Sequence, residues 1–293
     1  MIEGKKTIIP LGFDRCFKKI FGDNDAIERV EAFLSTYLNI PYEDIKGKVT
    51  VLNEEKRVAT KNSKRGAVDV LTDLNLDDNK KRVNIELNFF HKNIRRNIVY
   101  VCNFVSSSIK NREAYEKMPK ILQINFDKFD IDERNARIVK RYLLRDEENN
   151  ILDDGIEIDH VNIVKSYEVC YNQCIERIEA KDRKIIQLGA LLYASSMEEF
   201  EKCLSVIEME DRIKKEIVDA VEEYNEDEIE RMFYDEEEDK RMIQNDELII
   251  ARREGIKEEK ISIAKKLLSM NMTIENISEA TGLSKEEVQR LNG

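Results

Sequence analysis

The chain has 293 residues and a net charge of −11, with 49 lysines and arginines against 60 aspartates and glutamates. Hydrophobic residues make up 41% and charged residues 37% of the sequence, a balance typical of a well-solvated globular protein rather than a disordered or fibrous one. No apolar run approaches the ~20 residues that a membrane-spanning helix requires, and the first residues lack the features of a secretory signal. The five cysteines are odd in number and scattered, which favours reduced thiols. We therefore expect a cytoplasmic protein that makes no contact with a membrane.

The charge is unevenly spread along the chain. Residues 1–150 contain 29 basic and 24 acidic residues, a net charge of +5, whereas residues 151–293 contain 20 and 36, a net charge of −16. A mildly basic half suits the binding of phosphate groups. The acidic half as a whole does not suit a DNA-binding surface.

The hydrophobic pattern predicts helices first and a sheet after them. Apolar residues recur at helical spacing in two segments of 12–39, and Pro41 ends the second segment. The elements expected next are a strand at 48–58, a basic loop at 61–66, a hairpin at 67–88, a helix at 93–113, and strands at 120–129, 136–145 and 155–164. This order predicts an α/β (α+β) core with helices before and after the hairpin.

The hairpin at 67–88 carries two carboxylates on one face. Apolar and polar residues alternate along 82–89, the period-2 pattern of a half-buried strand. The cluster at 77–79 is rich in turn formers, and a turn there places Asp69 opposite Glu86 or Asn88, with the side chains on the polar face.

Two interpretations of that polar face are open. Polar strand faces are exposed by default, and an ordinary solvated hairpin would tolerate truncation of Glu86 at little cost in stability. Alternatively, carboxylate oxygens held on two adjacent strands are the ligands that Mg²⁺ prefers, and a divalent ion there could support phosphodiester hydrolysis.

The helix at 93–113 presents a polar stripe directly after the carboxylate strand. Its members are Arg96, Tyr100, Asn103 and Ser107. The apolar side is expected to consist of Ile98, Val101, Cys102, Val105 and Ile109. The stripe either lines a cleft, where Arg96 and Tyr100 hold a phosphate, or faces solvent.

From about residue 165 the pattern is helical to the end. The section 210–247 holds 17 acidic and 6 basic residues and is typical of a solvated helix or linker. In the last 36 residues, Thr273 and Ser284 are expected helix caps and Gly282 a turn residue, which predicts a helix-turn-helix. The region 248–293 has 8 basic and 7 acidic residues, a weak footprint for DNA contact. A packing or dimerisation role is the alternative.

Several segments together resemble a known family. They are 14-DRCFKKIFG-22, 68-VDV-70, 84-NIELN-88, 96-RNIVY-100, 120-KILQINFDKFD-130 and the C-terminal segment 251–291. In order and spacing the chain is similar to the PD-(D/E)XK nucleases, and more closely to the bacterial Rpn recombination-promoting nucleases, also described as PD-(D/E)XK nuclease family transposases. The resemblance covers nearly the whole chain. It implies a PD-(D/E)XK restriction-endonuclease-like core with a mostly helical C-terminal region.

The resemblance assigns roles to particular residues. Asp69 and Glu86 would ligate Mg²⁺ or Mn²⁺, with the backbone carbonyl of Leu87 as a third oxygen. Asn88 would stand at the third signature position, which is usually Lys in the superfamily and commonly Gln in close relatives. An amide can hydrogen-bond a water but supplies no positive charge, so the departure at Asn88 puts the rate, and activity itself, in doubt. Lys92, Arg95 or Arg96 would supply the missing charge from nearby.

Other residues are expected around this catalytic set. Lys64, Arg65, Arg96 and Tyr100 would contact DNA. Asp14 matches the acid of the family's first helix, and it either lies near the site or pairs with Lys18 one turn later.

The chain is therefore expected to be a metal-dependent DNA endonuclease that promotes recombination. The alternative is a catalytically degenerate nuclease fold that binds DNA or protein, and a transposase that also joins strands ranks last. The expected domains are a nuclease-like domain at 1–165, an acidic helical region at 166–247 and a helical tail at 248–293. The expected partners are DNA and a second copy of the chain, bound through the C-terminal helices.

Overall fold

The computed structural model forms two compact units, Met1–Arg231 and Met232–Gly293. It describes residues 7–22, 24–52, 69–76, 79–89, 94–109, 114–132, 134–172, 174–235, 259–270 and 272–291. No helix in these parts of the chain is both long enough and apolar enough to cross a membrane. The domain limits expected at 165/166 and 247/248 stay a prediction.

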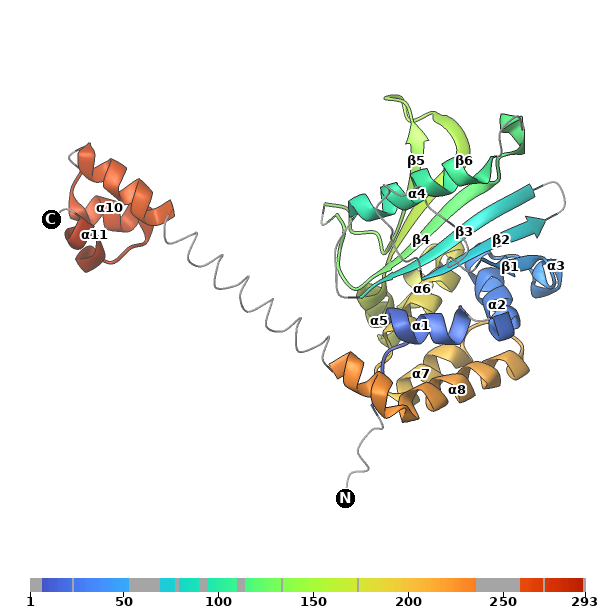
Figure 1. Ribbon diagram of the computed structural model, residues 1–293. Helices are drawn as coiled ribbons and strands as arrows, with labels where there is room; N and C mark the ends of the chain where they lie inside the picture. Colours follow the sequence, from blue (N-terminus) through green and yellow to red (C-terminus); the bar gives the residue numbers. More distant parts are fainter. Residues whose placement is uncertain are drawn as a thin grey trace, which may run out of the picture. The chain divides into compact units, whose positions relative to one another are not determined.

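A mixed six-stranded sheet forms the centre of the first unit (Figure 1). Its strands are β1 (Val49–Val51), β2 (Val70–Leu76), β3 (Asn79–Asn88), β4 (Lys120–Asp127), β5 (Val139–Arg145) and β6 (Ile151–Asn162). They lie in the order β1-β2-β3-β4-β6-β5. β3 pairs antiparallel with β2 and parallel with β4, and β4 pairs parallel with β6.

The expected α/β class is confirmed, and a strand lies in each expected segment, although the limits differ. Of the strand expected at 48–58, the structure describes Val49–Val51, and 53–58 lie outside the described residues. β6 begins at Ile151 and ends at Asn162, where 155–164 was expected, and β3 already begins at Asn79, which was expected in the turn.

Helices cover both faces of this sheet (Figure 1). The helices of the first unit include α1 (Asp14–Phe21), α2 (Ile27–Leu38), α3 (Tyr42–Ile45), α4 (Ile94–Ser108), α5 (Ile163–Tyr171), α6 (Ala180–Tyr193), α7 (Met197–Ser205) and α8 (Asp211–Glu226). Of these, α7 packs against α6, and α8 packs against α1 and α2. Phe33 of α2 packs edge-on against Phe126 of β4, with ring centroids 5.9 Å apart. Phe17 of α1 packs on Phe33 in the same manner at 5.6 Å. These contacts place α1 and α2 on one face of the sheet.

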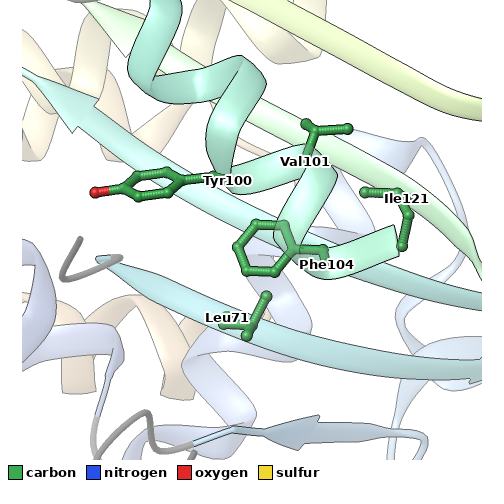
Figure 2. Packing of buried hydrophobic residues seen from close by; sticks show 5 residues of the cluster. All are labelled: Leu71, Tyr100, Val101, Phe104 and Ile121. Carbon is green, nitrogen blue, oxygen red and sulfur yellow. The ribbon is translucent and has the colours of Figure 1, made fainter. Parts of the chain in front are cut away.

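The opposite face is covered by α4. Figure 2 shows Tyr100, Val101 and Phe104 of this helix gathered with Leu71 of β2 and Ile121 of β4. All five side chains are buried. Burial of such apolar area stabilises the fold by roughly 25 cal/mol per Å², so this cluster fixes α4 across the strands that carry the carboxylates.

The orientation of α4 differs from the predicted one. Asn97, Tyr100, Val101 and Phe104 face inward, whereas Ile98 and Cys102, expected on the apolar side, are exposed. Of the expected polar stripe, Tyr100 is buried and Arg96 half-buried, while Asn103 and Ser107 face solvent. The predicted apolar side is correct for Val101, which is buried, and for Val105, which packs against the same cluster. It was wrong for Ile98 and Cys102, because Phe104 and Tyr100 bury larger surfaces than these two do.

Both faces of β3 are buried. Val83, Ile85 and Leu87 are buried on one face, as the alternation predicts. The polar side chains of the other face are buried as well: Arg82, Asn84, Glu86 and Asn88 are each at most 7% exposed. The interpretation as an ordinary solvated hairpin is therefore wrong. The alternation of a strand distinguishes its two faces, but it carries no information about a helix that later covers the polar one.

The second unit consists of three short helices, at 259–269, α10 (Ile274–Thr281) and α11 (Lys285–Leu291). They enclose a small core of Ala264, Ile277, Leu283 and Val288. Thr273 and Ser284 cap the last two helices as expected, and Gly282 turns the chain with φ of 67°. The helices and caps therefore lie where the sequence places them, and the assignment as a helix-turn-helix stays a prediction.

Candidate active site

The candidate site lies where β2 begins and β3 ends. The register that pairs Val70 with Ile85 extends to place Asp69 opposite Glu86, one of the two pairings expected. The backbone N–H of Asp69 donates to Oε1 of Glu86 over 3.3 Å. The N–H of Leu87 donates to Oδ2 of Asp69 over 2.6 Å. The hairpin ladder therefore fixes the two carboxylates next to each other.

Burial strongly perturbs this pair. The side chains of Asp69 and Glu86 are 6% and 1% exposed. Burial raises the pKa of Glu86 to about 8, and the charge of Asp69 adds to the rise. Burial also raises the pKa of Asp69, although the neighbouring Lys18 opposes that rise. Ionisation of both groups is therefore unfavourable in this buried place.

Two half-buried cations face the carboxylates, one each. Nζ of Lys18 lies 2.9 Å from Oδ1 of Asp69. Nη2 of Arg96 donates to Oε2 of Glu86 over 3.2 Å and to Oδ1 of Asn88 over 2.9 Å. The partner of Lys18 is thus Asp69, while Asp14 accepts from the N–H of Arg15. Asp14 is still close enough to raise the pKa values of Lys18 and Asp69 electrostatically.

Asn88 is fixed from both ends of its amide. Its Oδ1 accepts from Arg96, and its Nδ2 donates to Oδ1 of Asp127 over 2.9 Å. Oδ2 of Asp127 in turn lies 2.7 Å from Nδ1 of His160. All three of Asn88, Asp127 and His160 are buried. The amide oxygen of Asn88 therefore points to the carboxylate site, and its NH₂ group points away.

Sequence reasoning missed Asp127 and His160. The polar residues at 123, 125 and 127 do alternate along β4, and this was the available signal. The parallel pairing of β4 with β3 and β6, which sets Asp127 beside Asn88 and near His160, has no local sequence signature. Such pairing joins residues that are 39 and 33 positions apart in the chain.

A chain of buried amides supports Glu86 from the other side. Nδ2 of Asn84 donates to Oε1 of Glu86 over 3.1 Å and to Oε1 of Gln123 over 2.9 Å. Nε2 of Gln123 donates to Asn125, whose Nδ2 reaches the carbonyl of Asp159. This network crosses three strands and holds Oε1 of Glu86 in one orientation.

The donor set fits a hard divalent cation. Mg²⁺ commonly binds one or two carboxylates and completes its shell with waters and substrate phosphates. Asp69 and Glu86 match that pattern. Among the described residues no three His, Cys, Asp or Glu side chains form a metal-binding group, so further oxygens would come from the backbone, water or substrate. The N–H of Leu87 is used by Asp69, and the metal-ligand role of its carbonyl stays a prediction.

The expected DNA contacts divide into two groups. Lys64 and Arg65 lie outside the described residues. Arg96 lies at the site, and its side chain is 35% exposed. Tyr100 is only 5% exposed and packs in the core under α4. Its ring centroid lies 5.7 Å from the guanidinium of Arg96, so it is placed to support Arg96 rather than to bind DNA through its ring face.

Comparison with known proteins gives one match. Residues 12–249 match the family model described as PD-(D/E)XK nuclease family transposase. No curated protein and no solved structure matches the chain. The match covers most of the chain, including the hairpin with Asp69 and Glu86 and all six strands of the sheet. The chain therefore belongs to the PD-(D/E)XK nuclease family transposases.

Proposed function

We propose that the chain is a DNA endonuclease that hydrolyses phosphodiester bonds with Mg²⁺ or Mn²⁺ and thereby promotes recombination. The observation that carries the proposal is the buried Asp69–Glu86 pair with a half-buried cation on each carboxylate. A bound divalent ion would activate water and offset the charge that develops on the phosphate. Asp69 and Glu86 would hold that ion, and the carbonyl of Leu87 could add a third oxygen.

The side chains around the pair have separate tasks. Arg96 binds a phosphate oxygen after it releases Glu86 and Asn88, because the geometry of a guanidinium suits phosphate. Asn88 accepts a hydrogen bond from the attacking water through Oδ1. In the reaction the water oxygen bonds to phosphorus and one ester P–O bond breaks. The proton lost by water balances the proton gained by the leaving oxygen.

Nicking of supercoiled plasmid tests the proposal. The wild type is expected to nick with Mg²⁺ or Mn²⁺ and to stop in chelator, whereas Asp69→Asn and Glu86→Gln are expected to lose the activity. Glu201→Gln removes a carboxylate from an exposed position of α7 and is the matched control. Equal nicking by the wild type and Glu86→Gln would place the activity elsewhere. The recombination role predicts that the wild type, but not Glu86→Gln, raises recombination frequency when expressed in bacteria.

A catalytically degenerate binding module is the second candidate. The neutral Asn88, whose amide is engaged by Arg96 and Asp127, favours it. In that case DNA affinity would be the same in the wild type and Glu86→Gln, with no cleavage and no measurable Mn²⁺ binding by calorimetry.

The remaining proposals concern location and assembly. All five cysteines are free, which suits a reducing cytoplasm. The second unit exposes Ile263, Met270 and Met272, and these apolar side chains support self-association through the C-terminal helices. Sedimentation of the full chain and of a chain ending at 235 tests this. If both chains contain the same number of copies per particle, the C-terminal helices do not mediate self-association.

A further inference from the structure

We propose that Lys18 is a catalytic residue of this site, whose ammonium contacts the scissile phosphate and supplies the positive charge that Asn88 lacks. The proposal rests on the nuclease function proposed above and adds a residue from a separate element, α1. Sequence reasoning considered Lys18 only as a partner of Asp14.

The first argument is charge. Position 88, on the strand that carries Glu86, holds a neutral amide, whose two ends are occupied by Arg96 and Asp127. Hydrolysis of a phosphodiester builds negative charge on the phosphate, and a preorganised cation lowers its energy. Lys18 lies 2.9 Å from Asp69 and also interacts electrostatically with Glu86. It therefore supplies positive charge at the pair from outside the sheet.

The second argument is access. The side chains of Asp69 and Glu86 are 6% and 1% exposed, whereas that of Lys18 is 34% exposed. The side chain of Lys18, like that of Arg96, is thus partly open to solvent, the direction from which DNA must arrive. A lysine that served only to neutralise Asp69 would gain nothing from this exposure, since solvent weakens ion pairs.

The third argument is rigidity. The flanking Phe17 is fully buried and packs against the rings of Phe21 and Phe33. The carbonyl of Lys18 accepts the N–H of Gly22, which closes the helix. The backbone of Lys18 is therefore fixed, and only its four-carbon stem moves. A flexible ammonium on a fixed base can exchange a carboxylate for a phosphate oxygen without any change in the fold.

Three variants test the role. Lys18→Met keeps the length of the stem and removes the charge, and Lys18→Arg keeps the charge. Lys19→Met makes the same change at the adjacent, exposed position of α1 and is the matched control. Each is assayed for plasmid nicking, and its Mn²⁺ affinity without DNA is measured by calorimetry at the pH of the nicking assay.

The two readouts are expected to move in opposite directions. Lys18→Met should lower the nicking rate about a hundredfold, the usual effect of removing one preorganised donor. It should also bind Mn²⁺ about three- to tenfold more tightly, because the ammonium no longer competes for Asp69. Lys18→Arg should retain part of the rate, and Lys19→Met should match the wild type in both measurements.

Two results would overturn the proposal while leaving the nuclease function intact. One is wild-type nicking by Lys18→Met. The other is a joint loss of nicking and Mn²⁺ binding in Lys18→Met, which would make Lys18 a support for the shape of the carboxylate pair. Absence of metal-dependent nicking in the wild type would instead refute the proposed function itself.

Discussion

Glu86 is a buried carboxylate that accepts three hydrogen bonds, from the N–H of Asp69, from Asn84 and from Arg96. The expectation that its truncation costs little stability is therefore wrong. Glu86→Ala leaves these donors without an acceptor, at about 1–3 kcal/mol for each donor that stays buried. We predict that Glu86→Ala lowers the free energy of unfolding by roughly 2–4 kcal/mol, measured by urea denaturation, while Glu86→Gln keeps most of it. A neutral effect of Glu86→Ala would mean that the site is more open to water than its burial indicates.

The raised pKa of Glu86 makes stability depend on pH. Below the ordinary value of 4.5 the group is protonated in both the folded and the unfolded state, and the stability it contributes is fully present. As pH rises toward about 8, the unfolded chain releases the proton first, so the folded state loses stability. Because a tenfold change in proton affinity is worth about 1.4 kcal/mol, the loss is on the order of several kcal/mol. Asp69 acts in the same direction.

We therefore predict that metal-free wild type becomes less stable relative to Glu86→Gln between pH 5 and pH 8. Urea denaturation at several pH values measures this difference, with Glu201→Gln as the control that should follow the wild type. Parallel curves for the wild type and Glu86→Gln would contradict the raised pKa. Addition of Mg²⁺ should reduce the difference at pH 8, since the ion stabilises the ionised pair.

Asn88 offers a direct comparison of two positions for one cation. If Lys18 supplies the charge that position 88 lacks, adding Asn88→Lys to Lys18→Met should raise the nicking rate of that variant at least tenfold. This gain is a fraction of the effect of one preorganised donor. In the wild-type background Asn88→Gln should match or slightly exceed the wild type, and Asn88→Ala should be slower because no amide orients water. Equal rates in all these single variants would exclude a role for position 88.

At the scale of elements, the sequence predicts the parts whose signals are local. The alternation along β3 predicted its apolar face, and the turn formers after β2 predicted that Asp69 pairs with Glu86 or Asn88, of which the structure has the first. The caps at Thr273 and Ser284 are equally local. Burial of the polar face of β3 could not be predicted, because it depends on α4 crossing the sheet. The face that α4 turns toward the sheet depends on which of its side chains pack on Leu71 and Ile121. Because α4 has apolar residues on several sides, the sequence pattern does not determine which face this is.

The contact between Asn88, Asp127 and His160 joins three strands through side chains. Asp127→Asn keeps the shape but replaces the carboxylate that accepts from Asn88 and contacts His160. We predict a loss of about 1–3 kcal/mol in the free energy of unfolding and a nicking rate about tenfold lower, because the amide of Asn88 is no longer held in one orientation. Asp219→Asn, at an exposed position of α8, is the control for both measurements. An unchanged rate in Asp127→Asn would show that the orientation of Asn88 does not limit catalysis.

At the scale of the whole molecule, the positive net charge lies in the part of the chain that carries the candidate site. The first 150 residues carry a net charge of +5 and contain both members of the carboxylate pair, together with Lys18 and Arg96. The acidic residues concentrate after residue 150, and several are engaged in the fold. Glu230, for example, accepts two hydrogen bonds from Arg15 and one from Tyr224, at 2.7 to 2.9 Å. This contact anchors residues near the end of the first unit onto α1, the helix that carries Lys18.

The division into two compact units leads to the last prediction. All described site residues belong to Met1–Arg231, so a chain ending at 235 should fold and retain metal-dependent nicking. Region 248–293, with 8 basic and 7 acidic residues, should contribute few phosphate contacts, and each contact would add about 0.9 to the slope of log affinity against log salt. We therefore expect the shortened and the full chain to bind duplex DNA with the same salt slope. Fluorescence anisotropy measures this slope, and both chains carry Glu86→Gln to prevent cleavage. A slope that falls by two or more on shortening would assign DNA contact to the predicted helix-turn-helix, with Lys285 and Arg290 on its last helix as the first residues to replace.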